Sequence, residues 1–287
     1  MTHLRSTKSK LIIVEGIPGS GKSTLAGFIH NFYASQNIAS ELFLEGDLRH
    51  PADYESVACM PYQELNKIRS KYPDVCHLID PFVTMRGNDA LIPYALAQQS
   101  ALHQIPPSLY EELQHYEIYD GISVNQHCEL IVERWKSFAH QQRDQESKVV
   151  FECCFFQNPG CALLARHDAG ADRFIQHVLQ IAEQIQQLNP ILFYLKQSNV
   201  RETIDQVKTK RSQEWLDFVI WYHTEQEYGK NRGLHGYEGY LKFLEDRREL
   251  ELQIIEQLPF QSYIIDNTEY DWENQQQMVQ DILMKNI

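Results

Sequence analysis

Apolar runs and amphipathic helical patterns alternate along this chain. Five short apolar runs are typical of buried strands, at residues 11–14, 42–44, 149–151, 191–195 and 262–266. Helical spacing of apolar side chains separates or follows them, at 23–33, 127–142, 174–188, 200–210, 238–258 and from about residue 272 onward. This alternation predicts an α/β fold, a three-layer α/β/α sandwich around a five-stranded parallel sheet.

Two parts of the chain interrupt this alternation. After the second strand, residues 48–147 hold scattered helical patterns and several prolines, and no ordinary connection is so long. We expect a large, mostly helical insertion there, within a single domain over residues 1–287. After the fourth strand and its helix, residues 215–240 are rich in aromatic side chains and glycines, and we expect them to be irregular.

The first apolar run leads into a glycine-rich loop, "GIPGSGKS", residues 16–23. It fits the pattern G-x-x-x-x-G-K-[ST], in which backbone N–H groups hold phosphate oxygens at a helix N-terminus. Lys22 would reach the β- and γ-phosphates, and the Ser23 hydroxyl would bind Mg²⁺. The required order of strand, loop and helix is present, so we predict a nucleotide site formed by Gly16, Ile17, Pro18, Gly19, Ser20, Gly21, Lys22, Ser23 and Thr24.

Carboxylates follow the second and third apolar runs. In parallel α/β sheets, ligands bind where the strands end, so these side chains are expected near the loop. Glu152, after three apolar residues, is predicted to hold Mg²⁺ together with Ser23 or to orient the acceptor. Asp47, or Glu45 as second choice, is predicted to act as the base or to anchor the acceptor; a turn-forming Gly-Asp is equally compatible with Asp47. Arg49 and Arg86 are candidates for acceptor binding, or ordinary surface arginines.

Composition narrows the function and the compartment. The net charge is −13, whereas a protein that coats duplex nucleic acid is normally basic. The six cysteines form no C-x-x-C pair and indicate reduced thiols rather than a disulfide framework or a zinc site. We see no secretory leader at the N-terminus and no apolar run of membrane-spanning length, and we expect a cytoplasmic protein. The sequence leaves open whether it forms a homodimer.

Several segments resemble the nucleoside- and nucleotide-kinase branch of the P-loop phosphotransferases. "EGIPGSGKSTL" is similar to the phosphate loop of deoxynucleoside and thymidylate kinases, "ILFYL" with "VRETIDQVKTKR" to their strand and helix before the lid, and "YIIDNTEYDWENQQQMVQDIL" to their closing strand, adenine loop and last helix. "LEGDLRHP" resembles the D-G-D-x-x-R-H segment of adenylylsulfate kinases, with one residue fewer. The resemblance covers about two thirds of the chain, and only the loop is a sharp motif. Glu152-Cys153-Cys154 departs from the E-R-S and D-R-Y triplets of these families, so a standard nucleoside acceptor is in doubt.

The resemblance implies a division of labour along the chain. Residues 48–147 would bind the acceptor, and residues 211–240 would form a lid that excludes water from the transferring phosphate. Arg211 is the best lid arginine, followed by Lys208, Lys230 and Arg232, although each could be an ordinary surface cation. Asn267 and Thr268 would contact adenine. The aromatic side chains of the lid region are better explained by packing of a helix core than by base stacking: Trp215, Phe218, Trp221, Tyr222 and Tyr228.

Together these observations favour a P-loop small-molecule kinase. It would use ATP and Mg²⁺, with Lys22, Asp47, Glu152 and Arg211 as catalytic residues, and transfer the γ-phosphate to a small acceptor of nucleoside- or nucleotide-like kind. The alternative from another class is a nucleotide-dependent switch that hydrolyses ATP slowly. A kinase acting on a polynucleotide or tRNA end is a third reading, against which the acidity of the chain argues.

Overall fold

We describe the protein from a computed structural model that defines residues 8–287. Residues 1–7 lie outside the described part of the chain. They make up most of the N-terminal segment in which we expected no secretory leader. Within residues 8–287, no helix combines the length and the apolar character needed to cross a membrane.

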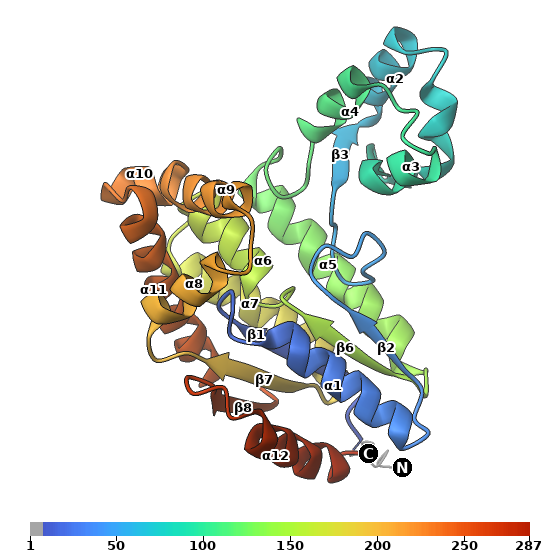
Figure 1. Cartoon of the computed structure of the whole chain (residues 1–287). Coiled ribbons are helices and arrows are strands. Elements are labelled where there is room, and N and C mark those ends of the chain that lie inside the picture. Colours follow the sequence, from blue (N-terminus) through green and yellow to red (C-terminus); the bar gives the residue numbers. More distant parts are fainter. Residues whose placement is uncertain (1–7) are drawn as a thin grey trace. The chain divides into compact units, whose positions relative to one another are not determined.

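A five-stranded, fully parallel sheet forms the centre of the larger part of the chain (Figure 1). Its strands lie in the order β2-β6-β1-β7-β8, which places β1 between β6 and β7. The register sets Val14 beside Glu152 and Glu15 beside Tyr194, so the ends of these strands come together. All five strands predicted from the sequence are confirmed: β1 (Leu11–Gly16), β2 (Ser40–Phe43), β6 (Lys148–Glu152), β7 (Ile191–Lys196) and β8 (Gln261–Asp266).

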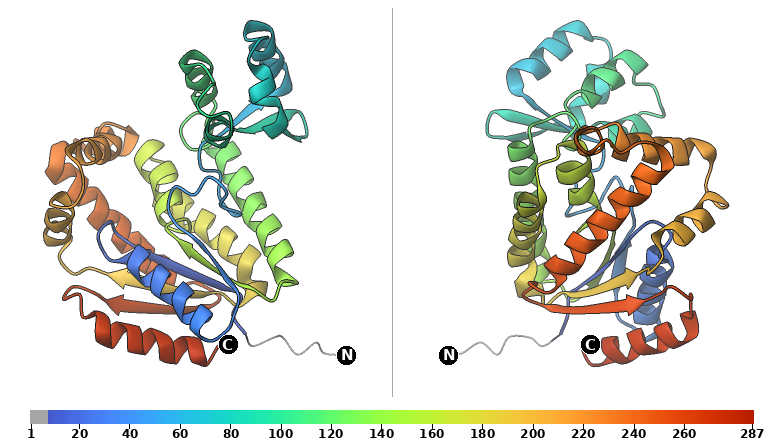
Figure 2. Two further views of the ribbon diagram at one scale, coloured as in Figure 1. Left: turned by 45° about the vertical axis from the view of Figure 1, so that its right-hand side comes forward. Right: turned by 90° about the vertical axis from the view of Figure 1, so that its left-hand side faces the viewer.

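Helices cover both faces of this sheet, as the α/β alternation predicted (Figure 2). On one face, α1 (Lys22–Ser35) and α12 (Trp272–Met284) pack on alternate strand residues, among them Ile12, Val14 and Phe193. On the other face, α5 (Val124–Arg143) brings Trp135 and Phe138 against Phe151 of β6, with ring centroids 5.6 and 4.8 Å away. The helices α7 (Ala171–Ile185) and α11 (Gly236–Ile255) also cover this face. The elements between β6 and β7 also include α6 (Gln157–Pro159), the π-helix η3 (Gly160–Arg166) and η4 (Gln186–Leu188).

The segment after β7 is more regular than the sequence suggested. Before α11 it forms α8 (Val200–Lys208), α9 (Gln213–Thr224) and α10 (Glu227–Arg232). The expectation of an irregular stretch at 215–240 is therefore wrong. The reason is local capping: the Ser212 hydroxyl accepts the Trp215 N–H at 3.3 Å and starts α9, and Gly233, at φ 63°, ends α10.

The aromatic side chains of α9 and α10 divide into two groups. Tyr222 and Tyr228 are buried, as the packing interpretation requires. Phe218 and Trp221, in contrast, are 56% and 50% exposed, with their rings in contact at 6.1 Å between centroids. For these two residues the prediction of core packing is wrong, because α9 turns only one side of its surface to the rest of the fold.

The chain separates into two compact units, and the second comprises residues 46–134. It contains α2 (Tyr62–Lys71), α3 (Tyr94–Ser100), α4 (Pro107–Gln114) and the short turns η1 (Cys76–Leu78) and η2 (Asp80–Phe82). The sequence did not predict its antiparallel sheet of β3 (Val57–Pro61), β5 (Asp89–Pro93) and β4 (Thr84–Arg86). Its own core includes Met60, Leu65, Ile92 and Leu109, all fully buried. The unit begins two residues before the expected insertion and ends inside α5.

Candidate active site

The phosphate loop, residues 16–23, joins β1 directly to α1. Two of its glycines are required by geometry. Gly19, at φ 83°, lies so close to α8 that a Cβ would come within 2.2 Å of Val207, and a Cβ on Gly21, at φ 97°, would meet the Trp272 ring at 2.3 Å. Neither position accepts a side chain, and the tight turn leaves the first N–H groups of α1 without helical partners, which is the usual basis of phosphate binding.

Lys22 lies over this loop. Its side chain is 6% exposed, and its Nζ donates to the backbone oxygen of Ile17 at 3.1 Å. Burial opposes the charge, but the nearby carboxylates of Glu152 and Glu45 more than offset it, so the pKa of Lys22 is raised. The ammonium group therefore stays charged at neutral pH in a place where it can meet an anion.

Ser23 and Glu152 meet at the ends of neighbouring elements. The Ser23 hydroxyl donates to Glu152 Oε1 at 3.1 Å, and Glu152 Oε2 accepts the backbone N–H of Glu45 at 3.0 Å. The parallel register causes this meeting, because β6 ends beside β1 just where the loop begins. Glu152 is 3% exposed, whereas Ser23 and Glu45 are exposed. The structure thus brings together the two residues predicted to bind Mg²⁺.

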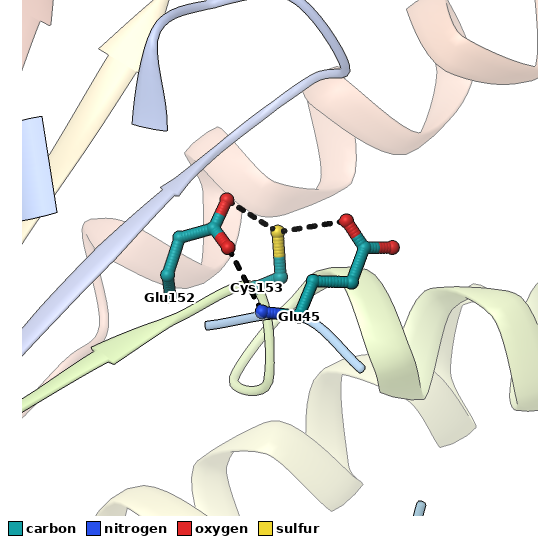
Figure 3. A group of neighbouring side chains, drawn as sticks. All are labelled: Glu45, Glu152 and Cys153. Carbon is teal, nitrogen blue, oxygen red and sulfur yellow. Dashed lines mark hydrogen bonds between the residues drawn. The ribbon is translucent and has the colours of Figure 1, made fainter. Parts of the chain in front are cut away.

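Glu45, Glu152 and Cys153 form a compact cluster beside the loop (Figure 3). The Cys153 thiol donates to Glu152 Oε1 at 3.0 Å and to Glu45 Oε2 at 3.7 Å. Gln157 completes the group, because its Nε2 donates to the other Glu45 oxygen at 2.6 Å. Of the two candidate bases, Glu45 is a member of this cluster.

The donor set of this cluster fits Mg²⁺. One carboxylate oxygen of Glu45, one of Glu152 and the Cys153 sulfur all lie within 4.8 Å of one another, and the Ser23 hydroxyl bonds to Glu152. Mg²⁺ takes oxygen ligands and retains waters, so the hydroxyl and the carboxylates suit it. Cys153 does not, because burial raises the pKa of its thiol well above 9 and keeps it neutral. Ser23 and Glu152 would hold the ion, with Glu45 near its waters.

Glu15, the last side chain before the loop, is completely buried. Its Oε1 accepts the backbone N–H groups of Phe155 and Phe156 at 2.7 and 2.8 Å, which ties the turn after Glu152 to β1. Burial first, and then the charge of Glu251, raise the pKa of Glu15 to about 8, although the two N–H groups and Lys22 lower it. Glu15 therefore fixes the turn that carries Glu152 and is largely protonated at neutral pH.

A buried polar network continues from Glu15 toward α11. Tyr194, beside Glu15 in the sheet, donates to Glu251 Oε2 at 2.6 Å. Glu251 in turn lies 2.9 Å from Arg247 Nε, and both side chains are 1% exposed. Despite burial, the charge of Glu251 raises the pKa of Arg247 above its ordinary value. Buried pairs of this kind cost much free energy if one partner is removed, so the network fixes α11 against the sheet.

The segment after β8 supports the loop from the other side. Asn267 is fully buried, and its Nδ2 donates to the Ser20 backbone oxygen at 2.6 Å, while its Oδ1 accepts from Gln275 at 2.6 Å. The Tyr270 hydroxyl donates to the Gly19 oxygen at 3.1 Å. The amide of Asn267 is thus engaged in positioning the loop, whereas the sequence assigned it to adenine. The adenine contact stays a prediction.

Three predicted acceptor or base residues belong to the second unit. The Asp47 carboxylate accepts the backbone N–H of Arg49 at 2.9 Å, as a turn-forming aspartate does. Arg86 pairs with Glu133 at 2.7 Å. Arg49 is exposed. Their roles in binding the acceptor stay predictions.

The predicted lid cations have local partners. The Arg211 guanidinium lies over the Trp215 ring at 5.8 Å, and Arg232 pairs with Asp168 at 2.8 Å and lies 3.7 Å from the Tyr228 ring centre. Arg211 thus lies between α8 and α9 against the first turn of α9, and Arg232, at the end of α10, is held between its own helix and the turn before α7.

Of the two lysines predicted to belong to the lid, Lys208, the last residue of α8, also has local partners. Lys208 pairs with Asp205 at 3.1 Å and lies over the Tyr237 ring at 4.2 Å, while Lys230 is exposed on α10. Lys230 and Arg232 therefore belong to a capped helix, α10, and not to the irregular stretch that the sequence predicted. The lid role of 211–240 stays a prediction.

The site and the fold can now be compared with known proteins. No protein-family model matches the chain, and no match was found among curated proteins. Among solved structures, one match is the thymidylate kinase from Candida albicans, at 14% sequence identity and a TM-score of 0.43, over 97% of this chain and 92% of that one. So distant a likeness carries no substrate to this chain, and the functional argument rests on the site itself.

Several residues of the site were missed in the sequence. They share one feature, which is that their partners are far away along the chain: Glu15, Cys153, Gln157, Tyr270 and Trp272. One of them did leave a signal. An acidic residue that directly continues a buried apolar strand must find a partner inside the protein, and Glu15 does.

Proposed function

We propose that this protein is an ATP-dependent phosphotransferase that moves the γ-phosphate of MgATP to a small-molecule acceptor. The observation that carries the proposal is the meeting of Ser23 with Glu152 at 3.1 Å, directly beside a glycine loop covered by Lys22. Phosphoryl transfer requires backbone N–H groups that bind the phosphates, a positive charge beside them and oxygen ligands for Mg²⁺. The loop, the Lys22 ammonium, Ser23 and Glu152 would supply these groups. Here they are contributed by β1, α1 and β6, whose packing fixes their spacing.

Each residue of the site has a defined task in this reaction. The loop amides and Lys22 would hold the β- and γ-phosphates and offset the charge that spreads over the transferring group. Bound Mg²⁺ would neutralise phosphate charge, held by Ser23 and Glu152. Glu45 would accept the proton of the attacking acceptor hydroxyl, since its carboxylate is exposed and lies at the open side of the cluster.

The acceptor is proposed to be a small molecule with a hydroxyl or phosphate group, nucleoside- or nucleotide-like in kind. We assign its binding to the second unit, residues 46–134, because an insertion of this size after the second strand has its own core and is not needed to complete the sheet. Cys153 and Cys154 occupy the positions that follow Glu152, and both are buried. Neither can supply the cationic contact that an arginine there would make with an acceptor.

The test is a transfer assay with γ-labelled ATP, Mg²⁺ and a fractionated pool of small metabolites that includes nucleosides and nucleoside monophosphates. We expect a labelled small molecule, and we expect its loss in the Lys22→Ala variant. Release of inorganic phosphate at a rate that no fraction changes would overturn the proposal in favour of a nucleotide-dependent switch.

A further inference from the structure

A basic cavity lies at the opposite end of the central sheet from the phosphate loop. It has a volume of about 520 Å³ and is lined from three places: the segment before β1, the second half of α5 and the turn after α7. Lys10 directly precedes β1, and Gly16 ends it, so the two sites are separated by roughly 20 Å at about 3.3 Å per strand residue. The volume falls in the range of small-molecule sites.

The lining of this cavity is strongly biased toward positive charge. Lys8, Lys10, Lys136 and Arg143 face one acidic residue, Glu183, in a protein whose net charge is −13. Such a concentration of cations in an acidic chain attracts anions selectively to this place, because the rest of the surface repels them.

Part of this charge is fixed by the backbone. The Lys10 ammonium donates to the carbonyl oxygens of Arg143 and of Gln145, the latter at 2.7 Å. The neighbouring Lys148, only 6% exposed, donates to the carbonyl oxygen of Ser9. Burial, and then the charges of Lys8 and Lys10, lower the pKa of Lys148. The cations crowd one another, and an anion would relieve their repulsion.

The remaining groups define the kind of anion. Besides charged residues, the described lining consists of three glutamines and Asn189, with no aromatic or aliphatic side chain. Amide groups and cations bind phosphate oxygens well, whereas a nucleobase needs an apolar or aromatic surface to stack on. Arg143 also pairs with Asp144 at 3.1 Å, so a ligand must compete with one carboxylate and needs more than one charge.

We propose that this cavity is a second anion site, which binds a compact molecule carrying two or more linked phosphate groups. The phosphate chain is recognised, either as a free oligophosphate or as the tail of a nucleotide. The exposed heads of Lys136 and Arg143 contact it, and Lys10, whose ammonium is held by two backbone carbonyls, supplies a fixed positive charge in the lining.

The test is calorimetric titration of the full chain with inorganic tripolyphosphate, in the Lys22→Ala background to weaken the loop. The pocket variant adds Lys136→Gln and Arg143→Gln, both exposed positions. The matched control adds Lys67→Gln and Lys71→Gln, which remove the same charge from exposed residues of α2. We expect the pocket variant to bind at least tenfold more weakly than the control, and the difference to shrink as salt is raised.

The two sources of the phosphate chain are separated by repeating the titration with ATP. Equal affinities for tripolyphosphate and ATP mean that the free oligophosphate is sufficient, whereas tighter ATP binding assigns the site to a nucleotide tail. The proposal is overturned if the pocket and control variants bind tripolyphosphate equally, or if the Lys22→Ala protein binds none at millimolar concentration. Circular dichroism of both variants checks that they are folded.

Discussion

The phosphate loop and the 211–240 segment both carry cations assigned to phosphate, yet they are built in opposite ways. Lys22 is 6% exposed, bonded to Ile17 and surrounded by acidic groups from β6 and the end of β2. The loop around it is held by Asn267 and Tyr270 from a distant part of the chain. The Lys22 ammonium is therefore held in one position, and it needs little rearrangement to bind a phosphate.

The cations of 211–240 are held by neighbours in their own segment or beside it. Arg211 lies over Trp215, and Arg232 is shared between Asp168 and Tyr228. To bind a phosphate, each arginine must first break its local contact. The free energy of that contact is lost and offsets part of the free energy gained by binding the phosphate. Preorganised cations should therefore dominate the free energy of ATP binding, and exposed cations should change it only slightly.

The largest effect is expected for Lys22→Ala. Because Lys22 is the preorganised cation of the loop, we expect ATP turnover to fall about 1,000-fold, comparable to removal of one fixed charge-stabilising donor. Lys230→Ala, an exposed lysine of α10, is the matched control and should stay within tenfold of the wild type. The measured quantity is kcat/KM for ATP. If it fell equally in both variants, the proposed difference between the fixed cation of the loop and the exposed cations of residues 211–240 would be wrong.

A somewhat smaller effect is expected for Glu152→Gln. The amide keeps the hydrogen bond from Ser23 but loses the charge that holds the ion, so activity should fall about 100-fold and the Mg²⁺ concentration for half-maximal rate should rise. Magnesium titrations of the rate at saturating ATP measure this. An unchanged magnesium requirement would show that the ion is held elsewhere.

A comparison of kcat between the Glu45→Gln and Asp47→Asn variants distinguishes the two candidate bases. Glu45 lies in the cluster with Glu152, and Asp47 already accepts a turn hydrogen bond, so only the Glu45 change should reduce kcat by about 100-fold. The Asp47 change is expected to alter kcat less than threefold. The reverse ranking, in single-turnover measurements, would return the role to Asp47.

Glu15→Gln should alter how stability depends on pH. The pKa of Glu15 is about 8 in the folded protein, against 4.5 for the ordinary group. Its contribution is therefore complete below pH 4.5 and is lost as pH rises to 8, because the unfolded chain releases the proton first. Between pH 5 and 9 the wild type should lose roughly 2 kcal/mol of unfolding free energy relative to the variant, after allowance for relaxation of the site. Parallel pH profiles in urea unfolding would contradict the buried, protonated Glu15.

The smallest effect is expected for the exposed arginines. Arg211→Ala and Arg232→Ala should each lower kcat/KM for ATP by no more than about tenfold, and most of this change should be a rise in KM for ATP. Arg201→Ala, an exposed arginine of α8 paired with Glu238, is the control. A loss for Arg211 as large as that for Lys22 would show that the lid cation becomes fixed during turnover.

Much of the fold follows from local patterns, and these were predictable. Strands β1, β6 and β7 are continuous apolar runs that only a doubly covered sheet can bury, and the glycine pattern after β1 requires a tight turn before a helix. Lys22, Ser23 and Glu152, the acidic residue that ends β6, were found for the same reason, because each lies at a fixed distance along the chain from an apolar run.

Other features depend on contacts between residues far apart, and no local pattern reports them. The short strand β3 pairs with β5 across the intervening helix α2, whereas β4 and β5 form a hairpin. Their five, three and five residues, for β3, β4 and β5, carry too little periodicity to be distinguished from helix. The place of Glu45 in the cluster likewise depends on contacts of its carboxylate with Cys153 and Gln157, which lie more than 100 residues further along the chain.

What this sequence determines by itself is therefore the phosphate loop, the order of the parallel strands along the chain and the choice of Ser23 and Glu152 as the pair predicted to bind the ion. What only the tertiary structure decides is how those groups are supported: Glu15 beneath the turn of Cys153, Asn267 beneath Ser20, and the cations of Lys10 and Lys148 gathered at the far end of the sheet. The physical reason is that a strand or a tight turn depends on neighbouring residues, whereas the burial and pairing of a charge depend on whatever the fold packs against it.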